Sequence, residues 1–282
     1  MTVVARRRAP ARLIRLDRML EAVPVFRLSD SAEDGALSFA ADDNSRWRVM
    51  PAPDERLPGT FDQDVYVELM HRFYEGGSPP DGVVTFTLHA FLRSMGRRVD
   101  GRTYEQLRSA LTRLERTAIE FTPADGEDTR RFSILSATAV ERRRLSERDQ
   151  LQLFPAVAVP DPGVARVALS PFIREHLELR QSVTLSMTSY LALQSPVARR
   201  LYRLIELARS ENMVTWRASF DRLREQLPLI QKFPSHLQRV LAPAHEMLKA
   251  AGILREAAFR QQHREWIVDY MIAPRTARRA DQ

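Results

Sequence analysis

Apolar positions in the stretch FTLHAFLRSM, residues 86–95, recur every three or four residues rather than every second one. This spacing predicts a short amphipathic helix, and Thr87 is suited to cap its first turn. The stretch TYEQLRSALTRLER, residues 103–116, keeps its tyrosine and leucines on one stripe. It begins with Thr103, three residues before Gln106, a spacing in which two side chains cap a helix start. The pattern therefore predicts two consecutive helices joined by a turn.

The turn between them, GRRVDGRT from 96 to 103, has the glycine spacing of a phosphate-binding loop, G-x-x-x-x-G-K-[ST]. Such a loop follows a buried strand and needs a lysine, whereas this turn follows a predicted helix and has Arg102 at the lysine position. We therefore interpret Gly96 as a left-handed helix C-cap and residues 99–101 as the turn into the next helix.

After Thr117 the pattern changes to alternation, with Ile119 and Phe121 on one side of a predicted strand. The polar stretch PADGEDTRR follows, and FSILSATAV, residues 132–140, is typical of a returning strand. Helix, turn, helix and hairpin in this order predict a winged helix-turn-helix unit, whose second helix usually enters the major groove of DNA.

The polar side of the second helix favours nucleic acid as its partner. From Arg93 to Arg116 the chain has seven arginines and three acids, and two more arginines flank the hairpin tip. Clustered arginines suit contacts with phosphates and guanine edges. The acidic tip DGED opposes a phosphate contact there. Amphipathic helices of this kind also occur as plain solvated surfaces or as protein-contact modules.

The same order of elements recurs towards the C-terminus. SFDRLREQL predicts a short helix capped by Ser219, and PLIQKFPSHL predicts a turn and a helix start with Ser235 as a candidate cap. HLQRVLAPAHEMLKAAGIL predicts a second helix, which Pro243 is expected to kink or split. A strand from Ile253, a polar tip at 260–265 and the alternating stretch WIVDYMI complete a second hairpin.

Each half also opens with a helical pattern that predicts a core helix, TFDQDVYVELMHRFYE in the first and SPVARRLYRLIELARS in the second. Short strands are expected in VFRL, ALSFA and RWRVM. The predicted fold is α+β, with two tandem winged helix-turn-helix domains, helix-rich with short antiparallel wing hairpins. The predicted limits are a basic N-terminal arm at 1–20, a first winged-helix domain at 21–145, a linker at 146–163, a second winged-helix domain at 164–274 and a basic C-terminal tail at 275–282.

Positive charge lies mainly at the two ends of the 282-residue chain. Its net charge is +7, of which residues 1–19 carry +5 and residues 275–282 carry +2, so residues 20–274 sum to zero. The body must therefore attract DNA through local patches. The arginine-rich start is equally compatible with an arm laid along DNA and with a solubilising extension.

Several chemistries are not expected from the residue types present. The chain has no cysteine, and its six histidines include no His-x-His pair and no pair four residues apart. No G-x-S-x-G elbow occurs. We therefore expect no enzyme, no catalytic residue, no metal site and no cofactor. The chain start lacks a secretory apolar core and no apolar run approaches a membrane span, so we expect a cytoplasmic protein associated with a nucleoid or plasmid, with no membrane partner.

Three stretches together resemble the plasmid replication initiators that bind repeated origin sites, or iterons, with two winged-helix domains. LPGTFDQDVYVELM is similar to their proline-glycine turn before an Asp-x-Asp-Val helix, and SPVARRLYRLIEL to the helix that opens their second domain, at Arg200, Leu201 and Tyr202. GRTYEQLRSALTRLERTAIEF carries the likeness at Gly101, Tyr104, Leu107, Leu111, Arg113, Leu114, Thr117 and Ile119. The likeness covers most of residues 57–210 and continues beyond them in plan only.

This resemblance implies a non-enzymatic initiator that binds repeats in the origin of a plasmid or secondary replicon, distorts adjacent AT-rich DNA and helps to load the host helicase. It also implies a dimer that represses its own gene and a monomer that starts replication. A transcriptional repressor with the same fold would instead prefer one palindromic operator. A protein-interaction module would show no salt-dependent DNA binding.

Residues on the polar side of each second helix, in the turns and on the hairpins are predicted to bind double-stranded DNA. In the first unit they are Arg97, Arg98, Arg102, Ser109, Thr112, Arg113 and Arg116, with Arg130 and Arg131 on phosphates. In the second unit they are Lys232, Ser235, His236 and Arg239, with Arg260 and Arg264 on phosphates.

Overall fold

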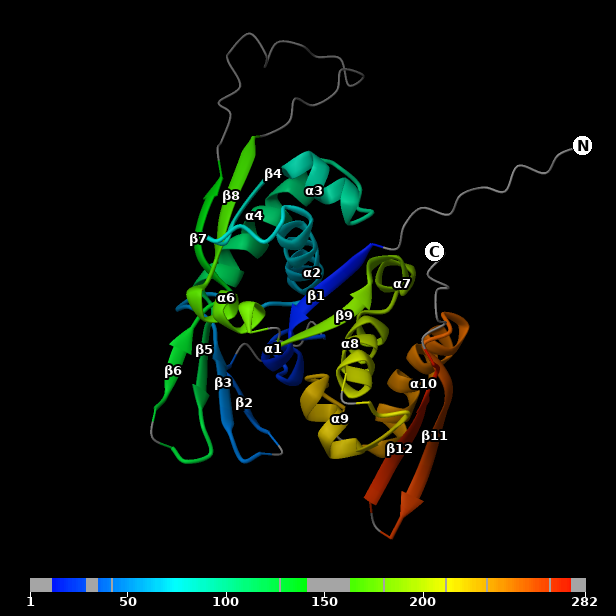
Figure 1. Cartoon of the computed structure of the whole chain (residues 1–282). Helices are drawn as coiled ribbons and strands as arrows, with labels where there is room; N and C mark the ends of the chain where they lie inside the picture. Colours follow the sequence, from blue (N-terminus) through cyan, green and yellow to red (C-terminus); the bar gives the residue numbers. More distant parts are fainter. Residues whose placement is uncertain are drawn as a thin grey trace, which may run out of the picture.

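The computed structural model (Figure 1) describes residues 12–28, 35–41, 43–126, 128–140, 163–179, 181–210, 212–231, 233–263 and 265–274. Residues 1–11, the segment 141–162 and the tail 275–282 lie outside the described residues, as do Lys232 and Arg264. In the described part of the chain, helices and antiparallel sheets form two similar units on either side of a small central sheet.

The first unit begins with its core helix and continues through the two predicted helices to a three-stranded sheet. Its elements are α2 (Thr60–Glu75), β4 (Val83–Thr87), α3 (Leu88–Ser94), α4 (Gly101–Arg116), β7 (Leu135–Val140) and β8 (Val164–Leu169). The strands pair antiparallel in the order β4-β8-β7, so the strand that precedes the two helices lies beside the last strand.

The second unit repeats this plan. Its elements are α8 (Pro196–Ser210), β10 (Thr215–Ser219), α9 (Phe220–Gln226), α10 (Pro234–Ala250), β11 (Leu254–Gln262) and β12 (Glu265–Ile272). Its sheet has the order β10-β12-β11, in which the strand before the helices again lies beside the last strand. The predicted fold of two tandem winged helix-turn-helix units is therefore confirmed.

The wing of the first unit is not the hairpin that the sequence pattern indicated. Strands β5 (Ala118–Thr122) and β6 (Arg130–Phe132) do pair, but they belong to a four-stranded sheet, β2-β3-β5-β6, with β2 (Leu37–Ala40) and β3 (Arg46–Met50). The counterpart of β11 and β12 is the pair β7 and β8. In Figure 1 this pair extends upward, whereas β5 and β6 extend downward. The prediction was wrong because it treated FSILSATAV as one returning strand. The alternation of that stretch breaks at the adjacent apolar residues Ile134 and Leu135, and the chain changes from one sheet to the other at Ser133 and Ile134.

Strand β8 also bears on the predicted domain limits. It begins at Val164, where the second domain was expected to begin, yet it pairs with β4 and β7. The predicted linker, 146–163, therefore lies between two strands of one sheet. The limits of the domains stay a prediction, and the strand pairing favours a boundary after Leu169.

The predicted N-terminal arm, 1–20, contains part of the folded body. Strand β1 (Leu13–Asp17) pairs antiparallel with β9 (Ser182–Ser186) to form the central sheet, and α1 (Arg18–Ala22) follows it. Strand β1 packs on α2 and β9 packs on α8, so this sheet lies between the two units (Figure 1). Ile14 and Leu16 are fully buried. The arm prediction counted the arginines here and overlooked this alternation. Helices α6 (Pro171–Glu178) and α7 (Met187–Ala192) flank β9.

Local hydrogen bonds explain where the helices of the first unit begin. The Thr87 side chain caps α3 and Gly96 ends that segment with φ +67°, as predicted. The backbone N–H of Thr103 donates to Asp100 at 2.9 Å, and the Thr103 hydroxyl oxygen accepts from the N–H of Asp100 at 3.0 Å. Asp100 is therefore the N-cap of α4, and Thr103 is the inner member of the capping pair rather than the cap.

The second unit agrees with its predicted pattern in part. Ser219 caps α9, since its side chain accepts the N–H of Arg222 at 3.2 Å. Helix α10 has Phe233 at its N-cap, so Ser235 lies inside the helix and the cap prediction was wrong. The helix also continues past Pro243, which removes one backbone donor without splitting it.

His245 makes the stability of the second unit depend on pH. It lies buried on α10, with Nε2 3.1 Å from the Tyr270 hydroxyl of β12. Burial, together with the charge of Lys249, lowers its pKa from 6.5 to about 4. The neutral ring of the folded state therefore contributes fully above pH 6.5, and that contribution is lost as the pH falls towards the folded-state pKa.

We expect urea unfolding to show that His245→Asn flattens the pH dependence of stability. Between about pH 7 and about pH 4.5, the free energy of unfolding of the wild type should fall by roughly 2 kcal/mol more than that of the variant. Parallel pH profiles of the two proteins would contradict this assignment.

Candidate nucleic-acid interface

Helix α4 presents an exposed polar strip opposite its apolar side. Its leucines are fully buried in the core of the first unit. The exposed side chains on the other side are Arg102, Glu105, Gln106, Ser109, Thr112 and Arg116, and all except Glu105 and Gln106 were predicted to bind DNA. Guanidinium groups and hydroxyls in one strip suit phosphate oxygens and base edges.

Arg113 does not lie free on this strip, contrary to expectation. Its Nε and Nη2 donate to the two carboxylate oxygens of Asp62, at 2.9 and 2.7 Å, and the two side chains are 13% and 2% exposed. Asp62 belongs to α2 and also accepts the N–H of Gly59 at 2.7 Å. Arg113 therefore fixes α4 on α2 through a bidentate pair. Helical spacing placed Arg113 on the polar side of α4. It could not predict the pairing with Asp62, which lies 51 positions away in the chain.

Arg97 and Arg98 occupy the turn before α4 and differ in exposure. Arg98 is 88% exposed and its Nε lies 3.5 Å from the Asp100 carboxylate, so it is accessible to a phosphate. Arg97 is 40% exposed, and its Nη2 donates to Asp64 of α2 at 2.5 Å. Arg98 is thus the more exposed of the two, and Arg97 is held by an acid of α2.

The loop before α2 adds charges beside α4. Glu55 pairs with Arg116, which therefore carries an acidic partner in this structure. Arg56 is exposed and lines the same shallow groove as Ser109 and Thr112. The sequence prediction missed Arg56, because the loop has no periodicity and only the tertiary fold brings it to α4.

Arg130 and Arg131 are exposed, but they lie on β6 of the four-stranded sheet and not on the wing. Arg131 pairs in register with Glu120, whose other neighbour is Arg48, so charges alternate across this sheet. These two arginines were expected beside the tip of the first hairpin, and they do lie on the paired strands β5 and β6, but those strands belong to the four-stranded sheet and not to the β7 and β8 wing.

In the second unit, the start of α10 carries the predicted polar residues. Ser235, His236 and Arg239 are all exposed. Phe233, at the N-cap, is 66% exposed with its ring 5.7 Å from the ring of His236, and the sequence prediction missed it. Exposed apolar side chains can contact thymine methyl groups in the major groove. Its only sequence signal was its position at the start of the predicted helix.

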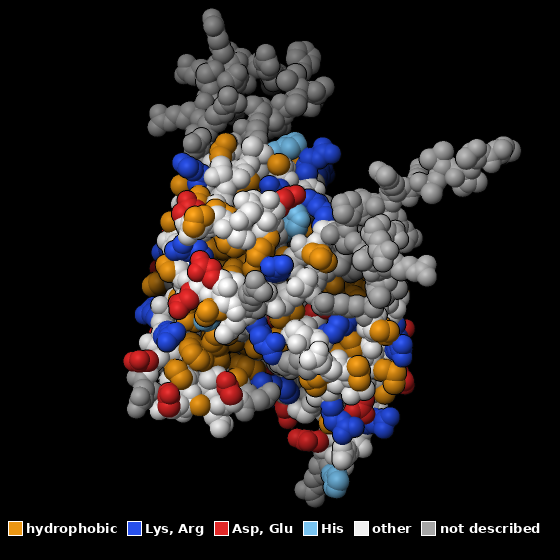
Figure 2. All heavy atoms as spheres, viewed as in Figure 1, with side chains coloured by type: hydrophobic (Ala, Val, Ile, Leu, Met, Phe, Trp, Pro, Cys, Tyr) orange, Lys and Arg blue, Asp and Glu red, His pale blue; other side chains and the backbone are white. Residues whose placement is uncertain are grey.

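Arg260 of β11 shares an acid with a second arginine. It is 66% exposed with Nε 3.1 Å from Asp269, and Arg217 Nε lies 2.6 Å from the other oxygen of that carboxylate. On the face shown in Figure 2, Lys and Arg side chains are spread over both halves and interspersed with acids rather than gathered in one patch. This agrees with attraction through local groups and not through one global field.

A model of the family described as replication initiator protein A matches residues 15–245 of the chain. The chain belongs to this family. The match spans both core helices and α4, the stretches on which the resemblance was based. No curated protein sequence matches the chain.

Two crystal structures of RctB domains 2 and 3 are similar to the initiator in fold. One has a TM-score of 0.57 at 11% identity and covers 91% of this chain and 97% of that one. The other, of selenomethionine derivatives, has a TM-score of 0.55 at 13% identity and covers 87% and 94%. The Pi initiator protein in complex with iteron DNA matches at a TM-score of 0.48 and 15% identity over 83% and 99%, a similarity too low to carry an argument.

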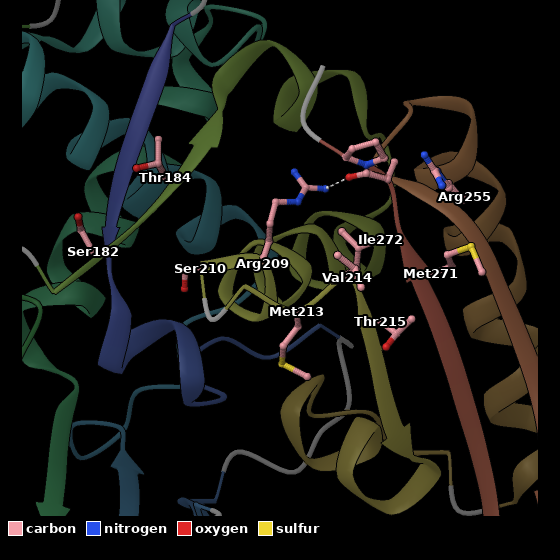
Figure 3. Close-up of a pocket in the computed structure, with 12 residues that line it drawn as sticks. Ser182, Thr184, Arg209, Ser210, Met213, Val214, Thr215, Arg255, Met271 and Ile272 are labelled. Atoms are coloured by element: carbon pink, nitrogen blue, oxygen red, sulfur yellow. Dashed lines mark hydrogen bonds between the residues drawn. The ribbon is translucent and has the colours of Figure 1, made fainter. Parts of the chain in front are cut away.

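A pocket of about 710 Å³ lies in the initiator between the central sheet and the second unit (Figure 3). Thr184 of β9 is on one side, Val214 and Met271 are on the other, and Arg209 donates to the carbonyl of Ala273 at 2.9 Å. No carboxylate or imidazole is among the described residues that line it.

The described ranges also contain no cluster of His, Asp and Glu arranged to hold a metal ion, and no helix long and apolar enough to cross a membrane.

Removing the Arg113 side chain should destabilise the initiator by about 3 kcal/mol, because the buried Asp62 carboxylate would lose its charged partner. The double variant Asp62→Asn/Arg113→Gln should recover part of this loss, since both groups are then neutral. Denaturant unfolding of Arg113→Ala, Asp62→Asn and the double variant measures the effect. A loss below about 1 kcal/mol in Arg113→Ala would mean that the pair contributes no more than an exposed one.

Proposed function

We propose that the initiator binds double-stranded DNA at repeated origin sites, with α4 and α10 each in a major groove. The observation that carries the proposal is the duplication of the winged helix-turn-helix plan, with exposed hydrogen-bonding and cationic side chains on the second helix of each unit. The two helices differ in sequence, so one chain is an asymmetric reader of DNA. An asymmetric reader suits direct repeats, whereas equal half-sites suit a two-fold dimer.

The proposed contacts divide by chemistry. Arg98, Arg102 and Arg116 bind phosphates at the first unit, while Ser109 and Thr112 face base edges. In the second unit, His236 and Arg239 face the groove with Ser235, and Lys232, Arg260 and Arg264 bind phosphates. Arg130 and Arg131, on the four-stranded sheet, are proposed to contact phosphates that flank the two major grooves bound by α4 and α10. Arg97 and Arg113 position α4 through their acids.

Membership of the initiator family supports the further steps of the proposal. Several copies on adjacent repeats would deform the neighbouring AT-rich DNA, whose flexible steps distort at low cost. The initiator then acts by binding and not by catalysis, in the cytoplasm with its replicon. Its proposed partners are the origin repeats, the host helicase and a second copy of the chain.

Selection of bound duplexes from sheared DNA of the source organism, at physiological salt, tests the function. We expect enrichment of regularly spaced direct repeats beside an AT-rich tract. A single palindrome over a promoter would instead make the protein a repressor, and the absence of any enrichment would leave DNA binding without support.

Replacing a phosphate-binding arginine should weaken binding to every duplex by a similar factor. The slope of log affinity against log salt is negative. For Arg98→Ala and Arg102→Ala, we expect the magnitude of this slope to fall by about 1 each. Fluorescence anisotropy across a salt series measures the slope. Arg15→Ala is the charge-matched control, because Arg15 is an exposed arginine of β1, away from both second helices. Equal slopes for all three variants would refute the assignment.

A further inference from the structure

Asp64 joins the first unit to the second through one buried carboxylate. It follows Asp62 by two residues on α2 and is 6% exposed. Its Oδ1 accepts from the Tyr190 hydroxyl at 2.9 Å, and its Oδ2 accepts from Arg199 and, at 2.5 Å, from Arg97. Arg97 lies in the turn before α4, whereas Tyr190 and Arg199 belong to α7 and α8. One side chain thus connects the helix-turn-helix of the first unit to the opening helix of the second.

The donors around this carboxylate are themselves fixed. Arg199 Nε donates to the carbonyl of Leu193 at 2.7 Å, and its guanidinium lies 5.2 Å from the centre of the Tyr190 ring. Burial, and then the charge of Asp64, raises the pKa of Tyr190 well above its usual value, which keeps its hydroxyl as a donor. Without the carboxylate, two guanidinium groups would face each other in a partly buried site.

We infer that Asp64 is a positioning residue that sets the distance and rotation between α4 and α10. It thereby sets the spacing of the two subsites that the initiator accepts within one repeat. The inference rests on the proposed function. DNA turns by about 34° for each base pair, so two rigidly linked helices meet their grooves at one spacing only, whereas a looser link accepts neighbouring spacings.

A second contact between the units explains why loss of Asp64 should loosen them rather than separate them. The Arg203 guanidinium of α8 lies 5.5 Å from the centre of the Tyr66 ring on α2 and is held by Glu21 of α1. This contact does not involve the turn before α4. In Asp64→Asn the units stay joined, and the connection to the helix-turn-helix is the part that is lost.

The experiment compares spacing profiles on labelled duplexes that carry the sequence selected by the wild type from a random pool. Footprinting locates the two protected subsites, and one or two base pairs are then inserted or removed between them. We expect the affinity of the wild type to fall about ten-fold or more per inserted base pair, a change comparable to a mismatch, and that of Asp64→Asn to fall by no more than about three-fold.

Asp62→Asn is the matched control. It makes the same substitution on the same helix and also removes a buried carboxylate from an arginine, but its partner Arg113 lies within the first unit. We expect weaker binding overall with the steep profile of the wild type. Tyr190→Phe removes one hydrogen bond and keeps the charge of Asp64, so it should flatten the profile partially even if Asp64→Asn does not fold.

Equally steep profiles in the wild type, Asp64→Asn and Tyr190→Phe would overturn the inference, as would a steep Tyr190→Phe profile if Asp64→Asn does not fold. Equal flattening by Asp62→Asn would also overturn it, because the effect would then be general destabilisation. A wild type that binds its repeat with no dependence on spacing would overturn the inference alone. A wild type that selects no sequence would overturn the proposed function and the inference with it.

Discussion

One fully buried carboxylate, that of Glu21 on α1, joins the N-terminal segment to the opening helix of the second unit. Glu21 accepts from Arg203 Nε and Nη2 at 2.6 and 2.7 Å and from Arg200 Nη1 at 3.4 Å, and all three side chains are buried. Removing such charges from water costs several kcal/mol per ion, so the cluster is stable only with every partner in place. Those partners come from the N-terminal segment and from α8. The cluster therefore favours one defined arrangement of the N-terminal segment on α8, and the Arg203 guanidinium, 5.5 Å from the centre of the Tyr66 ring, connects it to α2 of the first unit.

Burial and the excess of positive charge in this cluster shift the pKa values of its two arginines. Burial, and then the charge of Arg203, lowers the pKa of Arg200 to about 9. Burial also opposes the charge of Arg203, but the carboxylate of Glu21 outweighs it and raises the Arg203 pKa. Arg200 is further satisfied by the carbonyls of Val23 and Gln226, at 2.9 and 3.2 Å. Both guanidinium groups thus remain charged near neutral pH. Their burial depends on the partners that the N-terminal segment supplies, Glu21 and Val23.

Helix α2 extends this constraint to the side of the molecule that we propose to face DNA. Asp62 holds Arg113 of α4, while Asp64 holds the turn before α4 and the start of α8. Two acids on one core helix thus act on the proposed DNA-binding helix α4. Asp62 fixes α4 on the first unit, and Asp64 connects the turn before α4 to the second unit. The Asp-x-Asp pattern that carried part of the family resemblance has a physical role here, since each carboxylate is buried and each is paired with arginine.

The sequence by itself determined the order of the helices within the two units, the duplication of the plan and the apolar side of α4, because helical spacing and end caps are properties of neighbouring residues. Its motifs also indicated the family. The tertiary structure alone decided which strands are the counterpart of β11 and β12, that Leu13–Asp17 is a strand of the central sheet, and that Arg113 is paired with the buried Asp62. Arg113 and Asp62 lie 51 positions apart, and Glu21 and Arg203 lie 182 positions apart. Local periodicity shows which side of a helix is polar, but whether an arginine on that side meets solvent or a buried acid depends on which distant segment packs beside it.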